Sequence, residues 1–323
     1  MNYIGSKAKL LPFLDATISD FFGQSLEGKI FCDLFAGSGV VGNYFAQKGA
    51  RILSNDVEYY SYLLNRAQLQ TGFLEDTQSI IASLNALPLC KALMYTHYSY
   101  SSGRAYFSDE NAQKIDALRQ GIEAYKKSEM LYMYLLASLL CSADAVANTA
   151  SVYSAFLKKL KPQACEPLCL KPLAYTPTSA PHQVFCEDAN VLISRLKGDI
   201  LYLDPPYNRR QYGANYHILN TIAQYDIFIP KGKTGVRKYV SSPYCKAKHA
   251  FNALEEIVQK ANFPFVVLSY NDEGLLSHEA IEKMMKKYGD FSFVKIPHHR
   301  FKAYNNKAHK HHIYEYLYLL KKA

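Results

Sequence analysis

A glycine-rich turn between an apolar run and a helix is the feature that most constrains the fold of this chain. Residues 29–35 have the composition of a buried strand, Gly37-Ser38-Gly39 follows, and a helix is expected to begin near Val40. A second short strand over 50–54 leads into a Tyr- and Leu-rich helix over 58–70. Strand, helix, strand and helix in this order predict a parallel sheet with right-handed crossovers.

The sheet pattern resumes after a long interruption. Further strands are expected at 184–186, 199–203 and 265–269, followed by an antiparallel pair at 291–297 and 313–320. The intervening segment has helical patterns and proline-marked loops instead. We therefore predict an α/β fold with a mixed sheet of about seven strands. Residues 1–70 and 181–323 form its main domain, and 71–180 form an inserted, mainly helical region.

The bulk composition restricts the partners and the compartment. The formal net charge is +9, which favours a polyanionic partner such as nucleic acid. The seven cysteines form no CxxC pair, and no His or Cys cluster completes a zinc ligand set, so we expect no metal site and a reducing cytoplasm. No apolar run approaches the roughly 18 residues that span a bilayer, so no membrane segment is expected.

The glycine-rich turn has two interpretations. Gly37, Gly39 and Gly42 match the dinucleotide fingerprint, and Asp56 lies at a suitable distance for a ribose hydroxyl, so a nicotinamide or flavin oxidoreductase stays open. Asp33, however, stands just before the turn, where a carboxylate can meet the ammonium of S-adenosylmethionine. The pattern of Asp33, Phe35, Gly37 and Gly39 resembles the cofactor motif of class I methyltransferases.

Asp204-Pro205-Pro206-Tyr207 is the most specific motif of the chain. Two prolines end the preceding strand and restrict Asp204 to an extended conformation, which makes a rigid turn where open α/β sheets bind ligands. Adenine's exocyclic amine is a poor nucleophile because its lone pair is delocalised into the ring. The Asp204 carboxylate and the Pro205 carbonyl could each accept one N–H and draw the nitrogen towards tetrahedral geometry. Tyr207 could stack on an extruded base.

Together these motifs resemble the Dam-like class of adenine-N6 DNA methyltransferases in the alpha arrangement. In that arrangement the cofactor motif comes first, the target-recognition region next and the catalytic motif last. The resemblance covers most of the chain outside 71–180. It implies a class I (Rossmann-like) methyltransferase sheet that binds S-adenosyl-L-methionine, with 71–180 as the inserted DNA target-recognition region. Tyr3-Ile4-Gly5-Ser6-Lys7 resembles the family's aromatic-x-Gly-Gly-Lys motif, with Ser6 in place of the second glycine.

The resemblance also implies roles for individual residues. Asp56 would bind the ribose of the cofactor, Asp188 its adenine, and Asp204 both cofactor and target amine. The implied catalytic residues are Asp204, Pro205, Pro206 and Tyr207. The implied cofactor-binding residues are Tyr3, Lys7, Asp33, Phe35, Gly37, Gly39, Asp56, Asp188 and Asp204.

Four segments resemble a narrower set, the modification methyltransferases of the NlaIII and FokI type. They are Asn208-Arg209-Arg210-Gln211-Tyr212, Asn215-Tyr216-His217, Gly232-Lys233-Thr234-Gly235 and Leu268-Ser269-Tyr270-Asn271-Asp272-Glu273-Gly274. This implies a site-specific enzyme of a restriction-modification system, a separately acting cognate endonuclease and a target containing ATG.

A basic stretch after the catalytic turn is the expected contact with DNA. We predict phosphate contacts from Arg209, Arg210, Lys233, Arg237 and Lys238. Covalent cytosine-C5 methylation is unlikely, because the chain has no Pro-Cys dipeptide to supply the usual nucleophile. Transfer to cytosine N4 or to adenine in RNA, an oxidoreductase and a DNA-binding module with a decayed site remain the alternatives.

Overall fold

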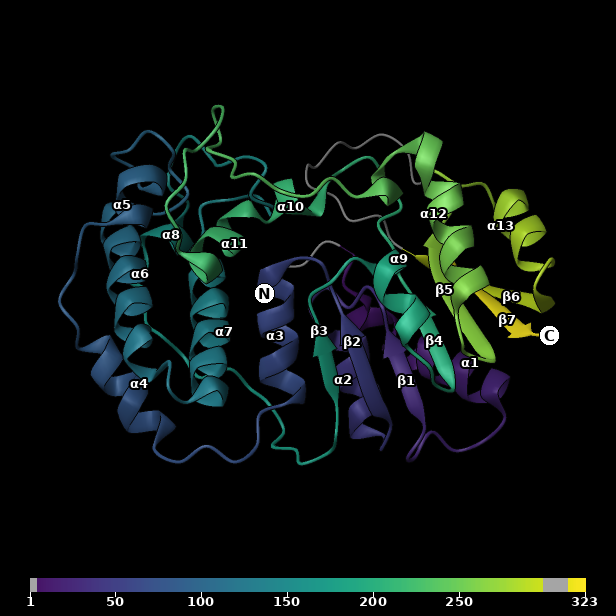
Figure 1. Cartoon of the computed structure of the whole chain (residues 1–323). Coiled ribbons are helices and arrows are strands. Elements are labelled where there is room, and N and C mark those ends of the chain that lie inside the picture. Colours follow the sequence, from purple (N-terminus) through teal and green to yellow (C-terminus); the bar gives the residue numbers. More distant parts are fainter. Residues whose placement is uncertain (1–4, 299–312) are drawn as a thin grey trace. The chain divides into compact units, whose positions relative to one another are not determined.

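The computed structural model describes residues 5–298 and 313–323 (Figure 1), and these form two compact units. The sheet unit comprises the described parts of Gly5–Val57, Ala180–Gln211 and Ser241–Ala323. The helical unit comprises Glu58–Ser179 and Tyr212–Val240. The helical unit is therefore larger than the predicted insertion at 71–180, because it also includes 58–70 and 212–240.

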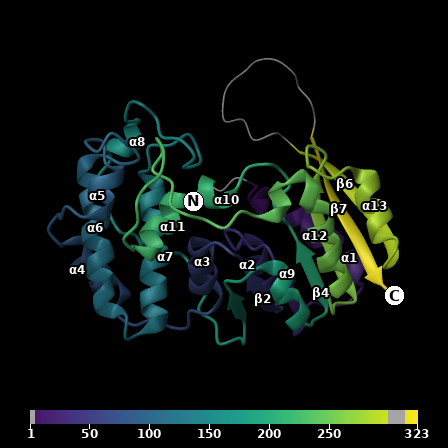
Figure 2. The same ribbon diagram turned by 45° about the horizontal axis from the view of Figure 1, so that its top comes forward.

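The sheet unit contains one seven-stranded mixed sheet with the order β3-β2-β1-β4-β5-β7-β6. The strands are β1 Ile30–Asp33, β2 Arg51–Asn55, β3 Gln183–Phe185, β4 Ile200–Leu203, β5 Phe265–Asn271, β6 Gly289–His298 and β7 Ile313–Lys322. The first five are parallel, whereas β7 runs antiparallel to both β5 and β6. Figure 2 shows β7 in yellow, running beside β6 to the C-terminus. The predicted mixed sheet of seven strands is confirmed.

Helices cover both faces of the sheet because side chains alternate along each strand. Phe31 of β1 stacks on Phe45 of α2, with ring centroids 4.4 Å apart. The neighbouring Cys32 faces the opposite core, together with Leu254 of α12. The helical elements of this unit are η1 Lys7–Leu10, α1 Leu11–Phe22, α2 Val40–Gln47, α9 Ala189–Leu192, η3 Ile193–Arg195, η4 Pro243–Cys245, α12 Ala247–Lys260 and α13 His278–Met285.

The helical unit has a separate apolar core, built around α7. Its elements are α3 Tyr59–Leu69, α4 Thr77–Asn85, α5 Leu93–Tyr98, α6 Asp109–Ile122, η2 Glu123–Tyr125, α7 Glu129–Ala145, α8 Pro162–Cys165, α10 Tyr212–Asn215 and α11 His217–Gln224. Leu63 of α3 and Leu219 of α11 are both fully buried in the same core as Leu136 of α7. This packing explains why α3 and α11 belong to the helical unit, although both were predicted to lie in the main domain.

Candidate active site

Three loops with acidic residues leave the same edge of the sheet. β1 lies between β2 and β4, and all three strands are parallel, so their carboxyl ends are neighbours. Asp33 ends β1, Asp56 follows β2 and Asp204 follows β4. The pairing continues one residue beyond β1, where the Leu34 amide donates to the Tyr202 carbonyl at 3.2 Å. The sheet therefore brings together the glycine-rich turn and the Asp-Pro-Pro-Tyr turn, which are far apart in the sequence.

The glycine-rich turn has a backbone that needs glycine. Gly37 has φ 52°, and Gly39, the N-cap of α2, has φ 77°; both values lie in the left-handed region that glycine tolerates best. Asp56 fixes this turn, because its Oδ2 accepts a hydrogen bond from the Gly37 amide at 2.8 Å. The residue expected to bind a ribose is thus joined directly to the turn expected to bind the cofactor.

Asp33 is a buried carboxyl group with one unsatisfied oxygen. Its Oδ2 accepts from the Gly42 amide at 3.1 Å, whereas Oδ1 is buried and accepts no hydrogen bond from any described residue. Burial raises the pKa of Asp33 to about 8, and the charge of Asp204 acts in the same direction. An unpaired buried carboxylate is costly, so this position favours a cationic ligand group.

Phe35 and Asp188 lie on the same sheet unit with evident local roles. The Phe35 ring packs edge-on against Tyr244 at 5.0 Å. Asp188 is exposed and caps α9, since its Oδ1 accepts from the Asn190 amide at 2.8 Å and the Val191 amide at 3.2 Å. A cap explains Asp188 structurally, so its expected contact with the cofactor's adenine stays a prediction.

Lys7 joins two carboxylates from distant parts of the chain. Its Nζ lies 3.1 Å from Asp204 Oδ1 and 2.7 Å from Glu315 Oε1, and the Ser269 hydroxyl donates to Glu315 at 2.6 Å. Burial raises the pKa of Asp204 to about 6; Lys7 opposes this shift and Glu315 adds to it. Burial alone would lower the pKa of Lys7, but Asp204 and Glu315 outweigh it and hold that pKa well above its usual value.

With these residues ionised, the cluster has one positive and two negative charges. Its net negative charge suits a site where positive charge develops during a reaction. Glu315 was not identified from the sequence as a site residue. The sequence pattern could have revealed it, because Glu315 is an acid at one of the alternate positions of β7 that are otherwise apolar: Ile313, Leu317 and Leu319.

The turn at 204–207 keeps two hydrogen-bond acceptors available beside the cluster of Lys7, Asp204 and Glu315. Lys7 pairs with Asp204 Oδ1, and neither Asp204 Oδ2 nor the Pro205 carbonyl has a hydrogen-bond donor among residues 5–298 and 313–323. The Tyr207 carbonyl accepts from the Leu275 amide at 2.8 Å, which fixes the end of the turn. The Tyr207 ring packs edge-on against Tyr270 at 5.9 Å, and Lys7 Nζ lies 5.9 Å from its centroid.

The N-terminal motif is only partly described. Tyr3 lies outside the described residues, so its expected contact with the cofactor stays a prediction. Ser6 has φ −55° and ψ 125°, values that any L-residue adopts, so serine fits where the family has a second glycine. Its side chain accepts from the Ala8 amide and caps η1, the element that presents Lys7.

The predicted DNA contacts differ in exposure. Arg209, Arg210, Lys233 and Lys238 are exposed, and none has an acidic partner in the described part of the chain. Arg237 is less accessible than these four: it is 8% exposed and pairs with Asp226 at 2.9 Å. Its predicted contact with phosphate stays a prediction.

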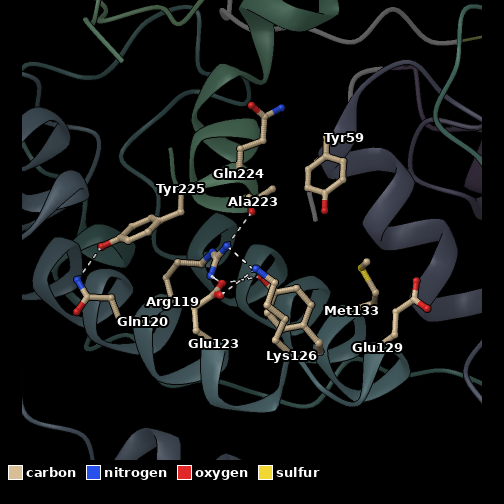
Figure 3. A pocket seen from close by; sticks show the side chains of 11 residues that line it. Tyr59, Arg119, Gln120, Glu123, Lys126, Glu129, Met133, Ala223, Gln224 and Tyr225 are labelled. Carbon is tan, nitrogen blue, oxygen red and sulfur yellow. Dashed lines mark hydrogen bonds and ion pairs between the residues drawn. The ribbon is translucent and has the colours of Figure 1, made fainter. Parts of the chain in front are cut away.

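The pocket in Figure 3 belongs to the helical unit and contains none of the predicted site residues. Arg119 from α6 donates to the Ile222 carbonyl at 3.0 Å and to the Ala223 carbonyl at 3.2 Å, and it pairs with Glu123. These contacts satisfy carbonyl groups at the end of α11, where a cation is favourable. The pocket is therefore explained by the packing of α6 against α11.

The sheet order and the site define an α/β protein of the class I methyltransferase type. The chain belongs to the family of D12 class N6 adenine-specific DNA methyltransferases, whose pattern matches residues 3–284. The type II methyltransferase M.NlaIII of Neisseria lactamica is 48% identical over 100% of this chain and 99% of its own length. M.CviAII of Paramecium bursaria Chlorella virus 1 is 37% identical over 94% of this chain and 93% of its own.

A third relative, M.FokI of Planomicrobium okeanokoites, is 35% identical over all of this chain but only 53% of its own length, so the chain spans about half of that protein. Membership of the family confirms the predicted enzyme class, adenine-specific methylation of DNA, and the predicted likeness to the NlaIII and FokI type. It argues against an RNA substrate and an oxidoreductase. No helix among the described residues has the length and apolar character needed to cross a membrane.

Proposed function

We propose that the chain transfers a methyl group from S-adenosylmethionine to the N6 amine of an adenine flipped out of duplex DNA, at Asp204-Pro205-Pro206-Tyr207. One observation carries the proposal: Asp204 Oδ2 and the Pro205 carbonyl accept no hydrogen bond from the described residues, and both lie beside the Lys7-bound oxygen of Asp204. An exocyclic amine has two N–H groups, which match two adjacent acceptors.

The cofactor site is proposed at the ends of β1, β2 and β3. The residues present fit S-adenosylmethionine, because Asp33 Oδ1, which is buried and has no donor within 5–298 and 313–323, offers a partner for an ammonium group. Gly37 and Gly39 permit close approach of the backbone, and Asp56, Asp188, Phe35, Lys7 and Tyr3 complete the proposed set. When bound, S-adenosylmethionine supplies a methyl group on a positively charged sulfonium.

Asp204 has two tasks in the proposed reaction. As a carboxylate it accepts one N–H while the Pro205 carbonyl accepts the other, which localises the nitrogen lone pair for in-line attack. The nitrogen–carbon bond forms as the carbon–sulfur bond breaks, and the amine must then lose one proton. Asp204, with its pKa raised to about 6, can accept that proton or pass it to water.

Tyr207 is proposed to hold the extruded adenine by stacking. Its ring is fixed by Tyr270 and by the backbone bond to Leu275, so little side-chain entropy is lost on binding. Stacking of this kind contributes roughly 1–3 kcal/mol per base, which offsets part of the cost of unstacking. Pro205 and Pro206 keep the turn rigid between Asp204 and Tyr207.

The last part of the proposal concerns the contacts with DNA and the biological role of the chain. We propose that Arg209, Arg210, Lys233 and Lys238 contact phosphates and that the helical unit reads the target sequence. Likeness to type II methyltransferases supports a role as the cytoplasmic modification enzyme of a restriction-modification system, beside a separately acting endonuclease. A target containing ATG is the expected recognition sequence.

Transfer of labelled methyl groups from S-adenosylmethionine to duplex DNA tests the proposal. Nucleoside analysis should find the label in N6-methyladenine. Asp204→Asn should lower the rate about 10²–10³-fold, because the amide removes a charged acceptor from the reacting nitrogen. The matched control is Asp290→Asn, an exposed carboxylate on β6, which should transfer at the normal rate. Normal transfer by Asp204→Asn would falsify the assignment.

A further inference from the structure

The segment 226–240, which follows α11 and is drawn in green in Figure 1, forms a hairpin. Its two arms meet at an antiparallel bridge between Lys231 and Val236, whose backbone hydrogen bonds measure 3.0 and 2.9 Å. Gly232 and Gly235 lie inside the tip with φ 67° each, the conformation that lets the chain reverse within a few residues. We refer to this segment as the 226–240 hairpin.

Its base is fastened to the core of the helical unit. The hydroxyl of Tyr225 donates to Asp116 at 2.6 Å, directly before the hairpin begins. Arg237 pairs with Asp226 across the two arms, and its guanidinium lies 5.0 Å from the centre of the Phe228 ring. The Tyr98 hydroxyl of α5 donates to the Gly235 carbonyl at 2.6 Å. These contacts restrain both arms and the tip.

The first arm turns apolar side chains to the outside. Ile227 is 100% exposed and Ile229 is 85% exposed, whereas Phe228 between them packs against the core. This alternation follows from the extended arm, in which neighbouring side chains point to opposite sides. Two large apolar side chains held in water on an anchored loop indicate a binding surface.

The same hairpin also carries exposed lysines. Lys231, Lys233 and Lys238 are exposed on the same hairpin, and none forms an ion pair with a described residue. Cations and an apolar pair on one hairpin match a duplex, which offers phosphates on both sides of a groove and stacked bases within it.

We propose that Ile227 and Ile229 form an apolar wedge that enters a groove of duplex DNA, while Lys231 and Lys233 contact the flanking phosphates. The inference rests on the proposed function and deepens it. A wedge that presses on a base step lowers the cost of unstacking there, which is the cost that extrusion of an adenine must meet.

Two double variants of the whole chain test the wedge, with binding to a fluorescent duplex measured over a range of salt concentrations. Ile227→Ser with Ile229→Ser should weaken binding about tenfold or more and leave the salt slope unchanged, because phosphate contacts remain. Lys231→Ala with Lys233→Ala should reduce the salt slope by about two. Cofactor affinity should stay normal in both variants, and so should the helix content measured by circular dichroism, which reports on the folding of the helical unit.

The controls use exposed side chains of the sheet unit that lie outside the proposed DNA contacts. Val294→Ser alters a residue of β6 that is 40% exposed, and Lys283→Ala removes an exposed lysine of α13; both should bind DNA normally. DNA binding by the isoleucine variant within about twofold of normal would overturn the wedge. So would self-association of the chain that this variant abolishes, since the surface would then bind a second copy. Failure of the unaltered chain to methylate any duplex would instead overturn the proposed function, and the wedge with it.

Discussion

The sheet unit and the helical unit use charged and apolar side chains in opposite ways. At the catalytic turn, Lys7, Asp204 and Glu315 are packed against one another, with Lys7 and Glu315 almost fully buried. On the 226–240 hairpin, lysines and two isoleucines face water. Groups that must stabilise charge in a reaction act best when fixed and shielded from solvent. Groups that must meet a polyanion stay hydrated until it binds, and released counterions then contribute to affinity.

The largest expected effect comes from removing the cation of the buried cluster. Lys7→Met leaves Asp204 and Glu315 without a positive partner and should lower the free energy of unfolding by about 3–5 kcal/mol near neutral pH. The loss should shrink as the pH falls towards about 6, because Asp204 without Lys7 has a higher pKa and takes up its proton before the unaltered chain does. Denaturant unfolding at several pH values measures this effect.

The control for that variant is Lys9→Met, which alters an exposed lysine of the same element and should leave stability nearly unchanged. If Lys7→Met and Lys9→Met unfold alike, the buried cluster does not stabilise the sheet unit.

A smaller effect is expected at the cofactor site. Asp33→Asn should weaken binding of S-adenosylmethionine about 10–100-fold, since an amide cannot ionise to pair with the ammonium when it binds. The pKa of Asp33 is raised to about 8, so at pH 7 its carboxyl is mostly neutral before binding and must release a proton to pair with a cation. Calorimetry in buffers of different ionisation enthalpy should detect this release in the unaltered chain and a reduced release in Asp33→Asn.

The pH dependence of transfer should report on Asp204. The pKa of Asp204 is raised to about 6, so the carboxylate predominates above that pH and the single-turnover rate should fall as the pH drops through it. Glu315→Gln removes a negative charge that raises this pKa, so the fall in the single-turnover rate at acid pH should move to lower pH. If the rate of Glu315→Gln falls at the same pH as that of the unaltered chain, Glu315 does not raise the pKa of Asp204.

The smallest expected effect, on DNA binding, concerns Arg237 at the base of the 226–240 hairpin. Arg237→Met breaks the ion pair to Asp226 but leaves Ile227, Ile229 and the exposed lysines in place. We expect DNA binding a few-fold weaker, from lost preorganisation, with normal cofactor affinity. If Arg237→Met instead reduces the salt slope by about one, Arg237 contacts phosphate and the original prediction for it is correct.

Local patterns made much of the sheet unit predictable. The expected strands correspond to β1 through β7 within a few residues, because apolar runs, glycines and prolines encode local geometry. The predicted order along the chain, cofactor motif before catalytic motif, also led to the correct family. Helix α3 was found from its pattern and assigned to the main domain, whereas its apolar face packs in the core of the helical unit. An apolar face does not reveal which core it joins.

By itself the sequence determined the two turns that define the enzyme. The glycines of 37–39 and the prolines of 205–206 act through their own backbone preferences, which need no distant partner. Only the tertiary structure decided which charges meet. Lys7 and Glu315 are 308 positions apart and pair because the sheet brings β7 beside β5 and Ser269 beside Glu315. Arg237 likewise pairs with Asp226 because the fold sets the two side chains together. Such pairings depend on strand order and packing, which no local pattern contains.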